Sequence, residues 1–319
     1  MTCARAEAAK NSKNAMVNNR GKKHNKPVPI AVIGYGIVGQ ALAYSFSRPK
    51  IKKDYLVSFY DEYKESSPLD TVVKKSDFIF ICLPTPMKLD ESGIDLSIIE
   101  DVISKITLYT NGTDKIIVIK STVAPGTTVF LEKKYPKTKF AFSPEFLAEA
   151  QYLKDAIHPD RIIIGAYDNR VLQRVTLLFK NRFPKTKIFT TDPTTAEMVK
   201  YMANMYLATK VIFGNEMFDM CQKLGIPYEE VKTMVVADHR IYDSHLTVTP
   251  ERGFGGKCFP KDMIAFLGAG KERGVNLELL STVWKINKRI RKVRDWEGIP
   301  FAVSQGKKGI SFAIKKKKT

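Results

Sequence analysis

The sequence lacks any run of about 20 apolar residues, which a helix needs to cross a bilayer, and its first residues lack the apolar core of a secretory signal. Cysteine is scarce: the chain of 319 residues has four, at positions 3, 82, 221 and 258, and their number and spacing fit neither a disulfide scaffold nor a zinc site. Lone cysteines are most often small buried apolar residues, which we expect for Cys82 and Cys221. These shortages predict a cytoplasmic protein with reduced thiols, no membrane span and no bound metal.

Acidic residues are scarce at both ends of the chain, which concentrates the net charge of +19 there. Residues 1–26 carry seven Lys or Arg against one Glu, and residues 305–319 carry six Lys and no acid, so each end contributes +6. Residues 1–26 also have almost no large apolar side chains and are predicted to form a disordered basic tail. The remaining charge of +7 suits a protein that binds anionic dinucleotides and sugar nucleotides. Because the tails have no aromatic interleaving and no nucleic-acid motif, a nucleic-acid partner is not expected.

From Pro27 onward, short apolar runs alternate with longer mixed segments, which is typical of buried strands separated by helices. The runs cover residues 30–33, 56–60, 78–82, 116–120 and 161–164. They predict an α/β fold over residues 27–192, in which right-handed βαβ units form a doubly wound parallel sheet.

A long helical stretch follows, over residues 195–224, with capping residues at Asp192 and Thr194 before it and Gly225 after it. It is expected to be the spine of a second, all-helical domain over residues 193–296. Further helices of this domain are predicted at residues 228–236, 260–267 and 277–293.

A glycine pattern, G-x-G-x-x-G, lies directly after the first predicted strand and before a helical segment at residues 40–47. Its positions are Gly34, Gly36, Ile37, Val38 and Gly39. Glycines there allow a tight turn and let a pyrophosphate approach backbone N–H groups at a helix N-terminus. The pattern therefore predicts a Rossmann-like NAD-binding domain.

Asp61 ends the second predicted strand, 22 residues after Gly39. A carboxylate at this place accepts hydrogen bonds from both ribose hydroxyls and repels a 2′-phosphate. We therefore predict that Asp61 selects NAD over NADP, the alternative being an ordinary acidic loop residue.

The stretch from Gly253 to Asp262 places Cys258 between a glycine-rich segment and a predicted helix. At a helix N-terminus, the positive end of the dipole and the flanking Lys257 and Lys261 are expected to favour the reactive thiolate. Asp262 is four residues further on, close enough in a helical turn to share the site. These features predict a nucleophilic cysteine and not a structural one.

Together with further motifs, these segments resemble the UDP-glucose 6-dehydrogenase family, within the UDP-glucose/GDP-mannose dehydrogenases, from about Val28 to Val293. The further motifs are Cys82-Leu-Pro-Thr85-Pro, Ser121-Thr122-Val-Ala-Pro-Gly, Ser143-Pro-Glu145-Phe-Leu-Ala-Glu149, Glu197-Met-Val-Lys200-Tyr-Met-Ala-Asn204 and Asp238-His-Arg240-Ile. The spacing of Lys200 and Asn204 alone fits a solvated helix face equally well.

The resemblance implies roles for the residues of these motifs. It implies that Thr85, Thr122 and Glu149 contact NAD, and that the sugar nucleotide is held by Phe146, Leu147, Ala148, Glu149, Lys200, Asn204, Phe254 and Gly255. It also implies a homodimer built on the long helix, with Arg240 reaching a substrate in the partner subunit.

The implied chemistry is the oxidation of UDP-glucose to UDP-glucuronate by two hydride transfers to NAD. Asp262 acts through a water on the C6 hydroxyl, while Lys200 and Asn204 stabilise oxyanions. Cys258 forms a thiohemiacetal and then a thioester, and Glu145 assists the hydrolysis. Thr122 belongs to both the catalytic and the cofactor-binding set.

The sequence departs from the family in two places. Only 20 residues separate Asp61 from Cys82, which predicts a reduced adenine-side pocket. Residues 297–319 are expected to be a truncated stub of the family's C-terminal UDP-binding domain. The alternatives are therefore a truncated NAD-binding dimer with weak or no turnover, and a dehydrogenase of GDP-mannose or another UDP-sugar.

Overall fold

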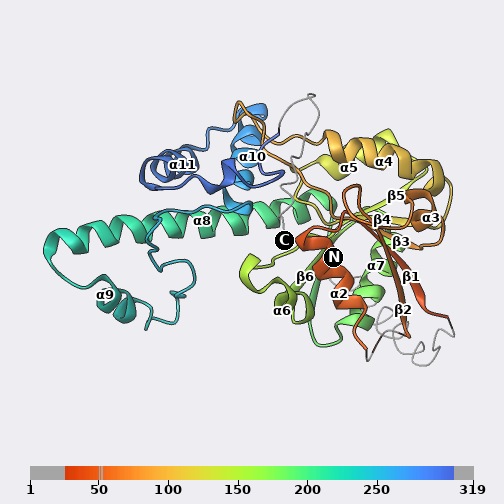
Figure 1. Cartoon of the computed structure of the whole chain (residues 1–319), viewed down its shortest axis with the longest axis horizontal. Helices are drawn as coiled ribbons and strands as arrows, with labels where there is room; N and C mark the ends of the chain where they lie inside the picture. Colours follow the sequence, from red (N-terminus) through yellow and green to blue (C-terminus); the bar gives the residue numbers. More distant parts are fainter. Residues whose placement is uncertain (1–25, 50, 52, 305–319) are drawn as a thin grey trace, which may run out of the picture.

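The computed structural model describes residues 26–49, 51 and 53–304. Residues 1–25 of the predicted basic tail and 305–319 of the predicted stub lie outside the described residues. The described chain has a sheet with helices on both sides and a long helix, α8 (Pro193–Leu224), that leads away from the sheet to a set of smaller helices (Figure 1). The predicted Rossmann-like α/β fold followed by a helical region is confirmed.

The sheet has seven strands in the order β2-β1-β3-β4-β5-β6-β7. Their bounds are β1 Val28–Ile33, β2 Tyr55–Tyr60, β3 Phe78–Ile81, β4 Ile116–Ile119, β5 Lys139–Phe142, β6 Arg161–Gly165 and β7 Lys187–Thr191. Neighbouring strands are parallel except β5 and β6, which pair in the antiparallel sense at Phe142 and Gly165. The predicted doubly wound parallel sheet is therefore confirmed, and the β5–β6 pairing is its one antiparallel junction among the described strands.

Two of the strands, β5 and β7, were not among the five predicted from the sequence. β5 is only four residues long and begins with a lysine, so its apolar run is too short to stand out. β7 is a sheet edge with mostly exposed or half-buried side chains and has no continuous apolar run. Edge strands carry a weaker hydrophobic signal because only part of their surface is covered.

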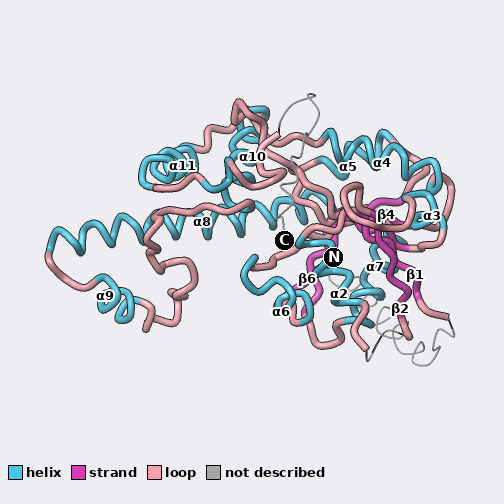
Figure 2. The backbone as a smooth tube through the Cα atoms, in the orientation of Figure 1, coloured by secondary structure: helices cyan, strands magenta, loops and turns pink. Residues whose placement is uncertain are grey.

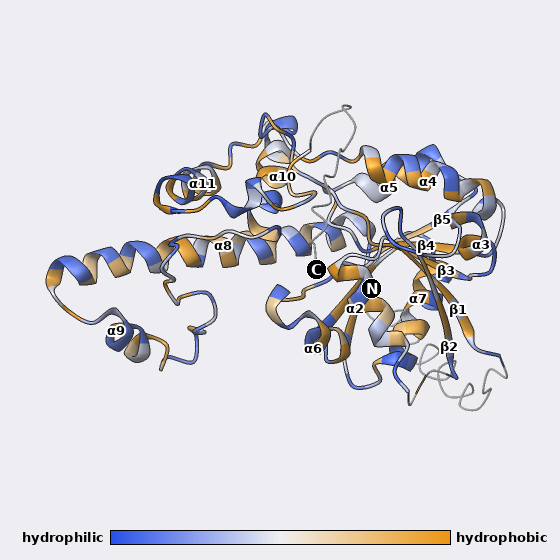
Figure 3. Cartoon of the chain, in the orientation of Figure 1, coloured by the Kyte–Doolittle hydropathy of each residue, from blue (hydrophilic) through white to orange (hydrophobic). Residues whose placement is uncertain are grey.

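Alternate residues of the central strands point to opposite faces of the sheet. On one face, Ile30 and Val32 pack against α2 (Ile37–Phe46) and α7 (Asn169–Arg182). On the other, Ala31 and Ile33 pack against α3 (Leu69–Lys74), α4 (Ser97–Thr110) and α5 (Thr127–Lys134). Burial on both faces explains why the strand sequences are continuously apolar (Figure 3).

Helix α8 ends at Leu224 as predicted and begins at Pro193, slightly before the predicted start at Thr195. The Asp192 carboxylate accepts a hydrogen bond from the Thr195 N–H at 2.9 Å, and Gly225 closes the helix in the left-handed region with a φ of 69°. With 32 residues and a rise of about 1.5 Å for each, the helix extends about 48 Å.

The helices after α8 pack along it and form a separate core. α10 (Cys258–Glu272) and α11 (Glu278–Ile290) lie on one side of α8, and α9 (Tyr228–Val235) lies at the end far from the sheet (Figures 1 and 2). Buried apolar residues of α8, α10 and α11 meet in this core, among them Met205, Met263 and Trp284. No helix in the described ranges is both long and apolar enough to cross a membrane.

The segment after α11 returns to the half of the molecule that contains the sheet. A short 3-10 turn at Asp295–Glu297 buries Trp296, and residues 302–304 then lie against the loop after β3. The Met87 N–H donates to the Ala302 carbonyl at 2.9 Å, and the Ser304 N–H donates to the Met87 carbonyl at 2.7 Å. The assignment of residues 297–319 to a further domain stays a prediction.

Candidate active site

The glycine loop after β1 has the shape expected of a phosphate-binding turn. Gly34 has a φ of 90°, and a Cβ at this position would lie 2.7 Å from the Cys82 carbonyl oxygen. A Cβ at Gly39 would lie 2.0 Å from the Gly34 carbonyl oxygen, so both positions require glycine. At Gly36 a Cβ would meet nothing within 4 Å, which leaves open space for a ligand in front of the N-terminus of α2.

Asp61 follows β2 and is joined to the glycine loop. Its Oδ2 accepts a hydrogen bond from the Tyr35 N–H at 2.6 Å, and its Oδ1 accepts one from the Tyr63 N–H at 3.0 Å. The carboxylate therefore stands beside the loop, at the carboxyl end of the parallel strands where dinucleotides bind in such folds.

A cavity of about 380 Å³ opens over this loop. Of the residues predicted to bind the cofactor, those that line it are Gly34, Gly36, Ile37, Val38, Asp61, Thr85, Thr122 and Glu149. Gly39 packs beneath the loop instead. The Thr85 hydroxyl donates to the Thr122 carbonyl at 2.9 Å, which links the two loops that close the cavity. The open glycine turn and the carboxylate beside it fit a dinucleotide.

A second cavity, of about 600 Å³, lies between α8 and the loop after β5. Of the residues predicted to bind the sugar nucleotide, those that line it are Phe146, Leu147, Ala148, Glu149, Lys200, Asn204 and Gly255. The two cavities share six lining residues, which are Val38, Glu145, Leu147, Glu149, Lys257 and Cys258. The Cys258 thiol therefore lies where the two cavities meet.

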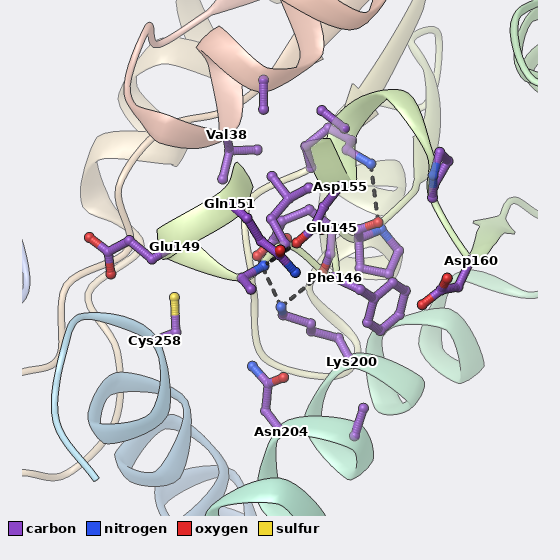
Figure 4. A pocket seen from close by; sticks show the side chains of 18 of the residues that line it. Val38, Glu145, Phe146, Glu149, Gln151, Asp155, Asp160, Lys200, Asn204 and Cys258 are labelled. Atoms are coloured by element: carbon purple, nitrogen blue, oxygen red, sulfur yellow. Dashed lines mark hydrogen bonds and ion pairs between the residues drawn. The ribbon is translucent and has the colours of Figure 1, made fainter. Parts of the chain in front are cut away.

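Cys258 is the first residue of α10, as predicted, and its side chain is exposed to the cavities (Figure 4). The pKa of its thiol is nevertheless raised, by desolvation first and then by the negative charges of Asp262 and Glu145. Lys200 and Lys261 lower that pKa but do not outweigh these effects. The expectation that the setting favours the thiolate is thus wrong for this conformation, because desolvation and the charges of Asp262 and Glu145 outweigh the effect of the lysines.

Lys200 and Glu145 form a buried ion pair across the larger cavity (Figure 4). The Lys200 ammonium donates to Glu145 Oε1 at 2.9 Å and to the Glu145 carbonyl at 2.8 Å. Burial by itself lowers the pKa of Lys200, but Glu145, Asp262 and Cys258 raise it above its usual value, so this lysine stays charged. Glu145 Oε2 is buried and has no hydrogen-bond partner among the described residues.

Asn204 stands one turn after Lys200 on the same face of α8, and both side chains are buried. Its amide nitrogen donates to Asp262 Oδ2 at 2.6 Å, while Oδ1 of Asp262 is paired with the Lys261 ammonium. Asp262 is 1% exposed and lines neither cavity. Asp262 therefore contacts the larger cavity only through Asn204 and the smaller cavity only through Lys261.

Two predicted substrate residues lie away from both cavities. Phe254 is 4% exposed and stacks on Trp284, and Asn287 binds the peptide groups on both sides of it. Its neighbour Gly255 lines the larger cavity. Arg240, on the exposed loop after α9, pairs with Asp238 at 2.5 Å.

Several cavity-lining residues were not recognised from the sequence. Lys120, at the end of β4, lies on the wall of the larger cavity, and burial lowers its pKa to about 8. His245, with a φ of 68°, lines the same cavity, and Lys64 and Phe301 line the smaller cavity over the glycine loop. Among these residues, only Lys64 could have been found from the sequence, because it stands three residues after Asp61. Within the described ranges, no cluster of three or more His, Cys, Asp or Glu side chains has the arrangement of a metal site.

The fold and the paired cavities define a Rossmann-type dinucleotide-binding protein with a cysteine at the junction of its two cavities. Residues 57–182 match the NAD binding domain of the UDP-glucose/GDP-mannose dehydrogenase family, and residues 194–289 match its central domain. The chain belongs to this family and carries its NAD-binding domain, so NAD is its cofactor.

Individual relatives agree with the family match. The UDP-glucose 6-dehydrogenase of Rickettsia conorii is 36% identical over 234 residues, which are 72% of this chain and 53% of that protein. The UDP-glucose 6-dehydrogenase of Bacillus subtilis is 34% identical over 220 residues, which are 67% of this chain and 49% of that protein. The chain thus spans about half the length of these relatives.

The fold comparison gives the same result. A UDP-glucose dehydrogenase from the hyperthermophilic archaeon Pyrobaculum islandicum superimposes with a TM-score of 0.74 and 27% identity, over 84% of this chain and 70% of that one. A GDP-mannose dehydrogenase with 24% identity and a TM-score of 0.59 shares the fold.

Proposed function

We propose that the chain oxidises the C6 hydroxyl of UDP-glucose to the carboxylate of UDP-glucuronate, with NAD as the hydride acceptor. The observation that carries this proposal is the position of Cys258, which lines both cavities. We call the smaller one, over the glycine loop, the cofactor cavity. A thiol at that junction meets a carbon held in one cavity and a nicotinamide held in the other. The names of the relatives support UDP-glucose as the substrate.

In the first oxidation, the residues of α8 bind the oxygen that becomes negatively charged. The Asn204 amide and the Lys200 ammonium are hydrogen-bond donors on one face of α8, so both are placed to stabilise an alkoxide. Asp262 fixes the Asn204 amide and receives the hydroxyl proton through a water. Bound NAD⁺ supplies the acceptor for the hydride that leaves C6.

In the second stage, Cys258 bonds to the aldehyde carbon. Lys200 lowers the pKa of this thiol, and its ammonium stabilises the oxyanion that forms when sulfur attacks. Loss of a second hydride from the thiohemiacetal gives a thioester. Water then replaces sulfur at the carbonyl carbon, which releases the acid and restores the thiol.

Glu145 is the proposed base for the hydrolysis. Its Oε1 is held by Lys200, while its Oε2 has no partner within the described part of the chain and is positioned to accept a proton from water. The overall reaction consumes one water and two NAD⁺ for each UDP-glucose, and the ratio of two NADH to one acid is its quantitative signature.

The choice of sugar and base is part of the proposal. The Lys261–Asp262 pair favours UDP-glucose or GDP-mannose over an N-acetylated sugar by resemblance. UDP-glucose, GDP-mannose and UDP-N-acetylglucosamine should therefore be compared as substrates at equal concentration. UDP-glucose is expected to give the largest rate, and a larger rate with either of the others would reassign the substrate.

The homodimer is also a proposal, and the surface of α8 supports it. Several large apolar side chains of this helix are exposed: Met198, Met202, Tyr206, Phe213, Met217 and Met220. A monomer rarely leaves so many apolar side chains of one helix in water. Sedimentation velocity should give a dimer, and Met202→Glu with Phe213→Glu should convert it to a monomer.

The test of the proposed activity is NADH production from UDP-glucose by the purified chain. Two NADH for each UDP-glucuronate are expected, and Cys258→Ser should stop acid formation while NAD binding persists. If the chain binds NAD as a dimer but gives no NADH with any of the sugars, it is the NAD-binding dimer without turnover, and the proposed activity is wrong.

A further inference from the structure

Phe301, near the C-terminal end of the described chain, reaches the wall of the cofactor cavity. It lines that cavity together with Asp61, Tyr63 and Lys257. Its ring centre lies 5.6 Å from that of Tyr63, and the Lys257 ammonium lies 5.9 Å from its ring centre. Tyr63 is bound to Asp61 and Lys257 directly precedes Cys258, so Phe301 stands between the carboxylate end and the thiol end of the cavity.

The backbone of Phe301 is strained. Its φ of 62° lies in the left-handed region, which bulky side chains avoid, and such residues persist only where the surrounding structure holds them. Strained residues of this kind cluster at binding sites. Here the strain coincides with a side chain on a cavity wall.

The neighbours of Phe301 hold it in place. Ala302 is fully buried and accepts a hydrogen bond from the Met87 N–H at 2.9 Å. The Ser304 N–H donates to the Met87 carbonyl at 2.7 Å, and the Ser304 hydroxyl donates to Asp95 Oδ2 at 2.7 Å. Residues 302–304 are thus fastened to the loops that follow β3.

We propose that Phe301 is a cofactor-binding residue that packs on the bound dinucleotide, and that NAD binding and the docking of residues 301–304 stabilise each other. An aromatic face on a base or ribose buries apolar surface that both groups otherwise expose to water. Since any ligand that contacts a docked segment favours its docking, the coupling works in both directions. The inference rests on the NAD site described above. The glycine loop of that site lies near the N-terminal end of the described chain, and Phe301 lies near its C-terminal end.

The first test is NAD affinity, measured by calorimetry on the full chain. Phe301→Gly removes the ring but suits a φ of 62°, so the segment keeps its backbone. Its dissociation constant for NAD should rise roughly tenfold, a typical effect of removing one aromatic stacking partner. Phe301→Tyr keeps the ring and should bind NAD like the unchanged chain.

A matched control is Phe130→Ala on α5. Phe130 is 49% exposed, carries a lysine ammonium 5.5 Å from its ring centre as Phe301 does, and lines neither cavity. Its removal should leave NAD affinity unchanged.

The second test is hydrogen exchange at the Met87 and Ser304 amides, which donate the two backbone bonds of the docked segment. NAD should slow their exchange in the unchanged chain and not in Phe301→Gly. If the unchanged chain binds NAD and Phe301→Gly binds it equally well, the proposal for Phe301 is wrong while the NAD site stands. If the unchanged chain binds no NAD, the NAD site itself is wrong.

Discussion

The Asn204 amide donates a hydrogen bond of 2.6 Å to the buried carboxylate of Asp262, and this bond joins the long helix α8 to the helix that begins with Cys258. Asp262 lies four residues after Cys258 on the same helix, and its negative charge acts on the thiol. Asp262 is the second-largest cause, after burial, of the raised pKa of Cys258. Asp262, which supports the proposed proton transfer, therefore also disfavours ionisation of the Cys258 thiol.

The first prediction concerns this charge. Asp262→Asn should lower the pKa of Cys258, because it removes a negative charge and keeps the size of the side chain. Alkylation of Cys258 by iodoacetamide at pH 7.5 should become faster by roughly several-fold, while oxidation of UDP-glucose falls by about 100-fold. Rates measured against pH, with Cys258→Ser as the background, give the shift. An unchanged profile would show that the Asp262 charge does not act on the thiol.

The second prediction concerns the cofactor. NAD should bind much more tightly than NADP. Asp61→Ala removes the carboxylate beside the glycine loop, so it should weaken NAD affinity by about tenfold and reduce the preference for NAD over NADP. Calorimetry with both cofactors measures this. Asp54→Ala, an exposed acid at the other end of β2, is the control and should change neither affinity. Equal affinity of the unchanged chain for the two cofactors would contradict the assignment of Asp61.

The third prediction concerns the contact between the sheet and α8. Glu197 is fully buried and accepts hydrogen bonds from the Gly126 N–H at 2.6 Å, the Thr128 N–H at 2.9 Å and the Thr128 hydroxyl at 2.6 Å. Glu197→Ala leaves the two buried Thr128 donors and the half-buried Gly126 N–H without this partner and should lower the free energy of unfolding by about 3 kcal/mol or more. Urea denaturation measures it, with exposed Glu216→Ala as the control. A loss below about 1 kcal/mol would mean that water replaces the carboxylate.

The fourth prediction concerns pH. Burial, followed by the charges of Glu197 and Asp168, raises the pKa of Glu132 from 4.5 to about 7. Between these values the folded protein holds a proton that the unfolded chain releases, so this stabilising contribution is complete below pH 4.5 and is lost as the pH rises through 7.

Glu132→Gln removes this dependence. The difference in melting temperature between this variant and the unchanged chain should be measured at pH 5 and at pH 8. The difference should shift in favour of the variant by about 2–4 °C from pH 5 to pH 8. Glu216→Gln, an exposed change on α8, should follow the unchanged chain at both pH values. If the two variants behave alike, the Glu132 carboxyl is not protonated in the folded protein.

Much of the fold could be predicted because its signals are local. The apolar run of β1 indicates burial on both faces of the sheet, and Gly34 and Gly39 indicate a turn that has no room for a side chain. β7 was missed because an edge strand has a weak apolar signal, and the antiparallel pairing of β5 with β6 was missed because strand direction depends on the path of the chain between them.

The sequence by itself determined the turns, the helix ends and the place of Cys258 at the start of α10, since each depends on residues within a few positions of one another. Tertiary structure alone decided the Lys200–Glu145 ion pair, the burial of Phe254 in the helical core, the raised pKa of Cys258 and the arrival of Phe301 at the cofactor cavity. The ion pair, the burial of Phe254 and the position of Phe301 arise from side chains that are distant in sequence, and the raised pKa of Cys258 arises first from the burial that this packing causes. Desolvation and nearby charge are properties of that packing, and no local pattern encodes them.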